Sequence, residues 1–270
     1  MSFIFANGIN HYYEVKGQGQ PIVFIHGAFV DSEMWNPQVE FFCSSYRVLR
    51  YDLRGHYRTG ESKLSRYRIE TFADDLKSIL DQLNIDKIIL CGLSLGGMIA
   101  QSFAVKYTEK LRCLILSDTA VSVRLTLSDK FQRYVLAPKW LMMSIIRWMS
   151  VPKFINFSIK LAQWTRSSDW FGKDPTTTEY VRKAMLRIPT SEYLKIYDAI
   201  YEFDLLELEK ITVPTLILNG EGESKSVFRH TKELLKQIPN SKSKIIAGAG
   251  HTSNLENPTE FNQLVSEFLI

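Results

Sequence analysis

The segment Gly92–Gly97 has the sequence Gly-Leu-Ser-Leu-Gly-Gly, and Ser94 is a candidate nucleophile for attack on an acyl carbon. The apolar run Lys87–Cys91 before it predicts a strand, and Met98–Val105 after it predicts a helix. A strand, a sharp turn and a helix would lift the serine hydroxyl clear of a sheet. The glycines two residues before and after Ser94 leave room for such a turn. The alternative is a glycine-rich turn with an incidental serine.

A serine hydroxyl is a weak nucleophile until a base removes its proton. The chain offers five histidines: His11, His26, His56, His230 and His251. His251 ends the glycine-rich run Gly-Ala-Gly-His, between a predicted strand and the last predicted helix, and such a loop can hold an imidazole at a sheet edge. His230 lies within a helical pattern and is expected to face solvent. His26 is expected to be structural, tying down its loop through its ring nitrogens.

Short apolar runs alternate with helical patterns over the first 120 or so residues. The predicted strands there are His11–Val15, Ile22–Ile25, Val48–Tyr51, Ile88–Cys91 and Leu114–Leu116. Between two of them, apolar residues from Ile69 to Leu83 recur at helical spacing. Strands separated by helices of this length imply βαβ units and a mostly parallel sheet.

Residues 122–205 break this rhythm. They contain four of the five tryptophans, and their helical patterns are interrupted by prolines. The alternation returns with predicted strands at Thr215–Leu218 and Lys244–Ile246 and with a final helix that begins at Pro258. The sequence therefore predicts an α/β core made of residues 1–121 and 206–270, with a helical cap at 122–205.

The composition is that of an ordinary globular chain of 270 residues, with 45% hydrophobic and 23% charged residues. The net charge is +4, and the Lys and Arg residues are scattered rather than clustered with aromatic residues. A nucleic-acid partner is therefore not expected. No run of 18 or more apolar residues occurs, so no integral membrane segment is expected.

The three cysteines, Cys43, Cys91 and Cys113, are odd in number and lack C-x-x-C spacing. This pattern argues against a disulfide framework and against a zinc site. The first ten residues lack the basic and apolar regions of a signal peptide. We therefore expect a cytoplasmic protein without a metal.

Five segments in family order make the chain resemble the α/β-hydrolase superfamily, and the resemblance covers the whole chain apart from the insertion. These segments are His26-Gly27, Tyr51–His56, Gly92–Gly97, Val213–Leu216, and Gly250-His251 followed by Glu256–Pro258. The branch that it resembles most contains small carboxylesterases and 3-oxoadipate enol-lactonase-like enzymes. The resemblance implies a mostly parallel eight-stranded sheet flanked by helices, with a helical cap inserted after the sixth strand.

The resemblance also implies a catalytic triad in the chain order serine, acid, histidine. Ser94 would be the nucleophile and His251 its base. The acid should follow the strand Thr215–Leu218, where we expect Glu223 to serve; Glu221 is the second candidate. Asp118, after an earlier strand, is the third.

An oxyanion hole of two backbone N–H groups is implied as well. The N–H of Leu95, directly after the nucleophile, should supply one donor, and the N–H of Ala28, in the loop after an early strand, should supply the other.

Two positions depart from the family pattern. Tyr57 stands where the family usually has Gly, so a positive φ there would strain it. The family acid is more often Asp, whereas Glu223 is one methylene longer.

These residues narrow the reaction. Haloalkane dehalogenases and epoxide hydrolases of this superfamily use an aspartate at the position of Ser94. The carbon–carbon hydrolases typically carry Trp after the base, where this chain has Thr252. The remaining reaction is acyl transfer to water through an acyl-enzyme, without cofactor or metal. We expect a carboxylic ester hydrolase acting on small-molecule esters with small to medium acyl chains; a lactonase or thioesterase would use the same triad.

Two other functions use the same fold and triad. One is a ligand receptor or signalling protein with slow turnover. The other is a hydroxynitrile lyase, which would release cyanide from a cyanohydrin. A homodimer that forms through the aromatic-rich cap is also compatible with the sequence.

Overall fold

The computed structural model describes residues 2–131, 134–135, 138–149, 151–165 and 174–270. The described residues form one sheet of eight strands in the order β1-β2-β4-β3-β5-β6-β7-β8. The strands are β1 (Ser2–Ala6), β2 (Ile9–Lys16), β3 (Gln20–Ile25), β4 (Tyr46–Tyr51), β5 (Ile88–Leu93), β6 (Leu111–Ser117), β7 (Thr215–Gly220) and β8 (Ser241–Ile246). The β1–β2 and β2–β4 pairs are antiparallel, and all other neighbours are parallel. The predicted mostly parallel, eight-stranded sheet is confirmed.

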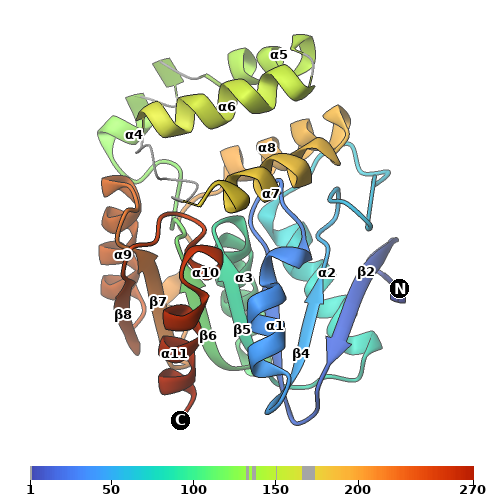
Figure 1. Cartoon of the computed structure of the whole chain (residues 1–270), viewed down its shortest axis with the longest axis vertical. Helices are drawn as coiled ribbons and strands as arrows, with labels where there is room; N and C mark the ends of the chain where they lie inside the picture. The colour runs from blue at the N-terminus through green and yellow to red at the C-terminus, as the bar shows by residue number, and fades with distance from the viewer. Residues whose placement is uncertain (1, 132–133, 136–137, 150, 166–173) are drawn as a thin grey trace.

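Helices cover both faces of the sheet (Figure 1). The helix α1 (Asn36–Phe42) packs against α11 (Pro258–Leu269) on one face, while α2 (Ile69–Gln82) packs against α3 (Leu95–Lys106) on the other. The remaining core helices are α9 (Lys225–Gln237) and α10 (Ser253–Glu256), with 3-10 turns η1 (Ser32–Trp35), η2 (Thr108–Lys110) and η4 (Leu208–Lys210). Sheet and helices together form the layered architecture of α/β proteins.

The centre of the core is the pair formed by β5 and α3. Every residue of β5 is buried, as expected for a parallel strand that is covered on both faces. Ten of the twelve residues of α3 are also buried, which leaves this helix with no wide polar face. The turn between these two elements is therefore anchored on both sides by packed structure.

The described residues between β6 and β7 form helices that lie beyond one end of the sheet (Figure 1). They are α4 (Leu127–Phe131), α5 (Lys139–Trp148), α6 (Val151–Thr165), α7 (Pro175–Leu186) and α8 (Thr190–Glu202). They follow the sixth strand, β6, in the part of the chain for which the sequence predicted a helical cap; the bounds of that cap, 122–205, stay a prediction. Of the predicted cap 122–205, residues 132–133, 136–137, 150 and 166–173 lie outside the described residues.

Candidate active site

Ser94 occupies the sharp turn between β5 and α3. Its backbone has φ 55° and ψ −113°, a conformation that non-glycine residues rarely adopt. Two hydrogen bonds to the end of β6 and the segment after it hold Ser94 there: the Ser94 N–H donates to the Ser117 carbonyl at 2.9 Å, and the Thr119 hydroxyl donates to the Ser94 carbonyl at 2.7 Å. Such strain persists only where the surrounding structure enforces it, and it is common at functional sites.

The two glycines around Ser94 are required by close backbone approach. A Cβ atom on Gly92 would lie 2.2 Å from the carbonyl oxygen of Gly96. A Cβ on Gly96 would lie 2.2 Å from the carbonyl oxygen of Ile25, at the end of β3. Both distances are far inside van der Waals contact, so the turn fits against its own helix and against β3 only without these side chains.

His251 lies within hydrogen-bond distance of the serine. Its Nε2 is 3.0 Å from the Ser94 hydroxyl oxygen. The loop before α10 that carries it is held by Glu256, whose carboxylate accepts from the N–H groups of Gly250 at 2.7 Å and Thr252 at 3.1 Å. The structure therefore brings together the two residues that the sequence predicted as nucleophile and base.

The carboxylate of Glu223 extends the series of hydrogen-bonded side chains that runs from Ser94 to His251. Its Oε2 is hydrogen-bonded to the Nδ1 of His251, and its Oε1 accepts from the N–H of Ser224 at 2.6 Å. The Glu223 side chain is fully buried, whereas 12% of the His251 side chain is exposed. A carboxylate so placed fixes the orientation of the imidazole ring through its Nδ1.

The other two acid candidates make different contacts. Glu221 is exposed, and its carboxylate accepts from the N–H of Gly248 at 2.9 Å. Asp118 is buried and accepts from the N–H of Gly220 at 2.9 Å. Among the described residues, Glu223 is the carboxylate that is hydrogen-bonded to His251.

The loop after β3 lies against the nucleophile. A Cβ built on Gly27 would stand 3.6 Å from the Cβ of Ser94. The next residue, Ala28, and the first residue of α3, Leu95, each carry an N–H that donates to no acceptor among the described residues. An unpaired N–H is normal at the start of a helix, and two beside a serine can receive a developing oxyanion.

His26 holds the loop after β3 through both of its ring nitrogens. Its Nε2 accepts from the N–H of Leu53 at 2.9 Å, so its Nδ1 carries the proton and donates to the Gly27 carbonyl at 2.8 Å. The carbonyl and N–H of a trans peptide point in opposite directions. The bond to Gly27 therefore turns the N–H of Ala28 away from His26. The predicted structural role of His26, tying the loop through its ring nitrogens, is confirmed.

His56 holds Phe29, the residue after Ala28, in the same way. Its Nε2 accepts from the N–H of Phe29 at 3.2 Å, and its Nδ1 lies 3.0 Å from the carbonyl oxygen of Arg54. Burial and the neighbouring His26 lower the pKa of His56 to about 3. Burial also lowers the pKa of His26. Both imidazoles are therefore neutral near pH 7, which their acceptor role requires.

Tyr57 has a φ of 29°, so this position does adopt the backbone conformation for which a glycine is suited. Its ring lies beneath two guanidinium groups, with ring centroids 4.7 Å from Arg58 and 4.2 Å from Arg187. Arg187 directly follows α7 of the cap. The strained tyrosine thus contributes a cation–π contact between cap and core that a glycine would lack.

Further contacts fix the cap above the loop after β3. Phe29, which has a φ of 62°, stacks on Tyr193 of α8 with a centroid distance of 4.6 Å. Asp31, almost fully buried, accepts from the hydroxyl of Tyr180 at 2.9 Å and pairs with Arg187 at 2.8 Å. The cap therefore contacts the residues directly after Ala28.

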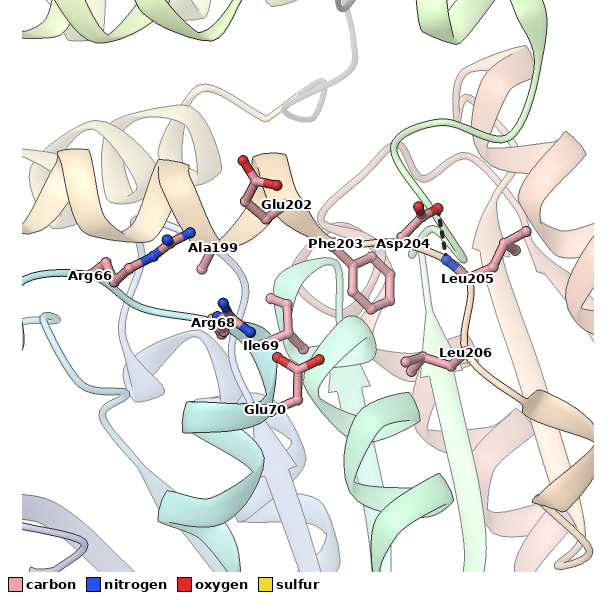
Figure 2. A pocket seen from close by; sticks show the side chains of 10 residues that line it. All are labelled: Arg66, Arg68, Ile69, Glu70, Ala199, Glu202, Phe203, Asp204, Leu205 and Leu206. Carbon is pink, nitrogen blue, oxygen red and sulfur yellow. Dashed lines mark hydrogen bonds between the residues drawn. The ribbon is translucent and has the colours of Figure 1, made fainter.

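A pocket of about 270 Å³ lies where the cap returns to the core, as Figure 2 shows. Its walls come from the start of α2 and the end of α8 with the chain that follows, and its charged lining residues have both signs. They are Arg66, Arg68, Glu70, Glu202 and Asp204. None of Ser94, Glu223 and His251 lines it, so it is separate from the candidate active site.

One sequence expectation was wrong. His230 lies in α9 with only 6% of its surface exposed, so it does not face solvent.

In the described part of the chain, no cluster of His, Cys, Asp and Glu is placed to hold a metal ion. None of the helices described is long and apolar enough to cross a membrane.

Comparison with known proteins identifies the family of the chain. The family model for the alpha/beta hydrolase fold matches residues 20–258, and the chain therefore belongs to that family. It is 28% identical to 3-oxoadipate enol-lactonase 1 of Acinetobacter baylyi, over 92% of this chain and 88% of that protein.

Two solved structures are similar over nearly their whole length. The enol-lactonase from Burkholderia xenovorans is 26% identical with a TM-score of 0.85, covering 99% of both chains. A thermophilic esterase from Thermogutta terrifontis is 26% identical with a TM-score of 0.84, covering 100% of this chain and 98% of that one. These relatives are hydrolases that act on esters or lactones by name.

The close approach at the serine turn predicts a stability difference between two glycine substitutions. Gly92→Ala should lower the free energy of unfolding by about 2 kcal/mol or more, because the added methyl group overlaps the Gly96 carbonyl. Gly27→Ala is the matched control, since its Cβ would meet neighbours at 3.5–3.6 Å, which is ordinary contact. Urea denaturation of both variants measures the difference. Equal stabilities would contradict the described turn.

Proposed function

We propose that the chain is a serine hydrolase that cleaves carboxylic esters of small to medium acyl chains through an acyl-enzyme. The observation that carries this proposal is the hydrogen-bonded line from Ser94 through His251 to Glu223. The line begins at a strained turn, beside the N–H groups of Ala28 and Leu95, which have no acceptor in the described part of the chain. Nucleophile, base, orienting acid and oxyanion donors are thus present together, as acyl transfer requires.

The protons of His251 follow from its two partners. An ionised Glu223 only accepts hydrogen bonds, so the Nδ1 facing it carries a proton. In the neutral imidazole the Nε2 is then free to accept, and it faces the Ser94 hydroxyl. His251 removes the Ser94 proton as the serine oxygen attacks the acyl carbon. Glu223 stabilises the resulting imidazolium and keeps its own charge.

The remaining steps use the same groups. The carbonyl π electrons move to the acyl oxygen, and the N–H groups of Ala28 and Leu95 hold the oxyanion. When the tetrahedral intermediate collapses, the alkoxide leaves with the proton from His251. Water then attacks the acyl-enzyme, with His251 again accepting and returning one proton, and the carboxylic acid leaves. Each oxyanion donor typically contributes roughly 10²–10³ in rate.

The relatives support two forms of the substrate, since one is named as an esterase and two as enol-lactonases. A lactone is a cyclic ester, so its alcohol remains attached to the acyl-enzyme after ring opening, and the chemical steps are otherwise the same. The linear ester is the form we propose, and a lactone is the second candidate.

Hydrolysis of p-nitrophenyl esters with two to twelve acyl carbons tests the proposal. The wild-type protein should turn over short chains repeatedly, and Ser94→Ala should lose at least about 10³-fold in kcat because it lacks the nucleophile. Circular dichroism of both proteins serves as the folding control. The chain-length profile then measures the acyl length that the site accepts, and a simple lactone in the same assay separates the two substrate forms.

Other outcomes of this assay would contradict the proposal. A single burst of p-nitrophenol without turnover would indicate a slow-turnover receptor. Unchanged activity in Ser94→Ala would place the chemistry elsewhere on the protein.

The acid is tested by a pair of isosteric substitutions. Glu223→Gln should lower kcat roughly 10³-fold or more, because the amide cannot stabilise the imidazolium of His251. Glu221→Gln should retain activity within about twofold, because its carboxylate faces the Gly248 N–H instead. If Glu221→Gln showed the larger loss, the orienting acid would be Glu221.

A further inference from the structure

Asp118 is a buried carboxylate that the proposed reaction does not use. It directly follows β6, has a φ of 47° and is 1% exposed. Its Oδ1 accepts from the N–H of Gly220 at 2.9 Å, and its Oδ2 accepts from the hydroxyls of Ser117 at 2.8 Å and Ser253 at 2.5 Å. Three donors therefore converge on one buried carboxylate, which satisfies both of its oxygens.

Each of these donors lies on, or is hydrogen-bonded to, a segment that carries a triad residue. The carbonyl of Ser117 accepts from the N–H of Ser94 at 2.9 Å. The carbonyl of Gly220 accepts from the N–H of Glu223 at 3.1 Å, and Ser253 is two residues beyond the base. Asp118 therefore joins the serine turn, the acid loop and the base loop.

The charge of Asp118 acts on the same residues. Burial and the nearby charge of Glu223 raise the pKa of Asp118 to about 7, while His251 and the hydrogen bonds from Ser253 and Gly220 oppose this rise. Glu223 and His251 are the principal charged groups around it, one after β7 and the other before α10. A second carboxylate charge thus appears beside the His251–Glu223 pair as the pH rises through neutrality.

We propose that Asp118 is a positioning residue whose negative charge adds to that of Glu223 in stabilising the His251 imidazolium. This inference rests on the proposed serine-hydrolase function. If Asp118 were only a hydrogen-bond anchor, asparagine could replace it, since its amide oxygen can still accept from Gly220 and the two serine hydroxyls can rotate to accept from its NH₂ group. Asp118→Asn therefore removes the charge and keeps the shape.

The test is the pH dependence of kcat and kcat/KM on a p-nitrophenyl ester, for wild type, Asp118→Asn and Ser253→Ala. In Asp118→Asn, kcat should fall about tenfold, and KM should change less than about twofold. The acidic limb of the profile, where activity falls as the pH is lowered, should move about one unit to lower pH. When the negative charge of Asp118 is absent, the active site binds a proton less readily. The ionisation of Asp118 itself is then also absent from the acidic limb of the pH profile.

Ser253→Ala should move the acidic limb in the opposite direction. It removes a hydroxyl that donates to the charged carboxylate of Asp118 and leaves the charge in place, so Asp118 ionises at higher pH. Opposite shifts from two neighbouring variants are not a result of general structural damage. If Asp118→Asn fails to fold, the shift in Ser253→Ala decides alone.

Protein stability provides a second readout. Because the pKa of Asp118 is raised in the folded chain, its contribution to stability is full below its unfolded pKa of about 3.9 and is lost as the pH rises through about 7. The free energy of unfolding of the wild type should therefore decline between about pH 4 and 7 relative to Asp118→Asn.

The outcomes separate this inference from the proposed function. An acidic limb that is unmoved in both variants, with Ser94→Ala inactive, would overturn the role of the Asp118 charge and leave the serine hydrolase intact. Activity that persists in Ser94→Ala would overturn the proposed function itself. A limb that moves to higher pH in Asp118→Asn would also overturn the inference, because the sign would be wrong for a lost negative charge.

Discussion

The carboxyl ends of four neighbouring parallel strands meet at one edge of the sheet, and the candidate site depends on this constraint. The strands β5, β6, β7 and β8 are adjacent and parallel. Ser94, Asp118, Glu223 and His251 follow them in that order. Residues more than 150 positions apart in sequence thereby come within hydrogen-bond distance, as Ser94 and His251 do at 3.0 Å. The loops supply the functional groups, and the sheet determines where they meet.

Charge is distributed unevenly around the serine. On the base side, Glu223 is buried against His251, and Asp118 accepts hydrogen bonds from Gly220 and Ser253 of the two segments that carry them. On the oxyanion side, His26 and His56 are held neutral by burial and hydrogen-bond the backbone around Ala28. Negative charge therefore lies where an imidazolium would form, and uncharged backbone donors lie where an oxyanion would form. This separation favours proton transfer from the serine to His251 during attack.

The sequence predicted the parts of this arrangement that depend on local pattern. The strand–turn–helix around Ser94 and the buried runs of the central strands have clear periodicity. The strand β1 was missed because Phe3 and Phe5 are exposed at the sheet edge, although Asn7-Gly8 is a strong hairpin signal. The choice of acid rested on the family resemblance, since several carboxylates follow strands. The hydrogen bonds of Asp118 join residues far apart in the sequence, and no local pattern reveals them.

The most direct test of the central claim is covalent labelling by a p-nitrophenyl alkylphosphonate, followed by peptide mass mapping. Its phosphorus accepts a serine nucleophile and forms a stable adduct that resembles the tetrahedral intermediate. An activated Ser94 predicts one adduct per chain, located on Ser94, and far slower labelling in Glu223→Gln and His251→Ala. A folded protein that remains unlabelled, or an adduct on another residue, would contradict the proposed site.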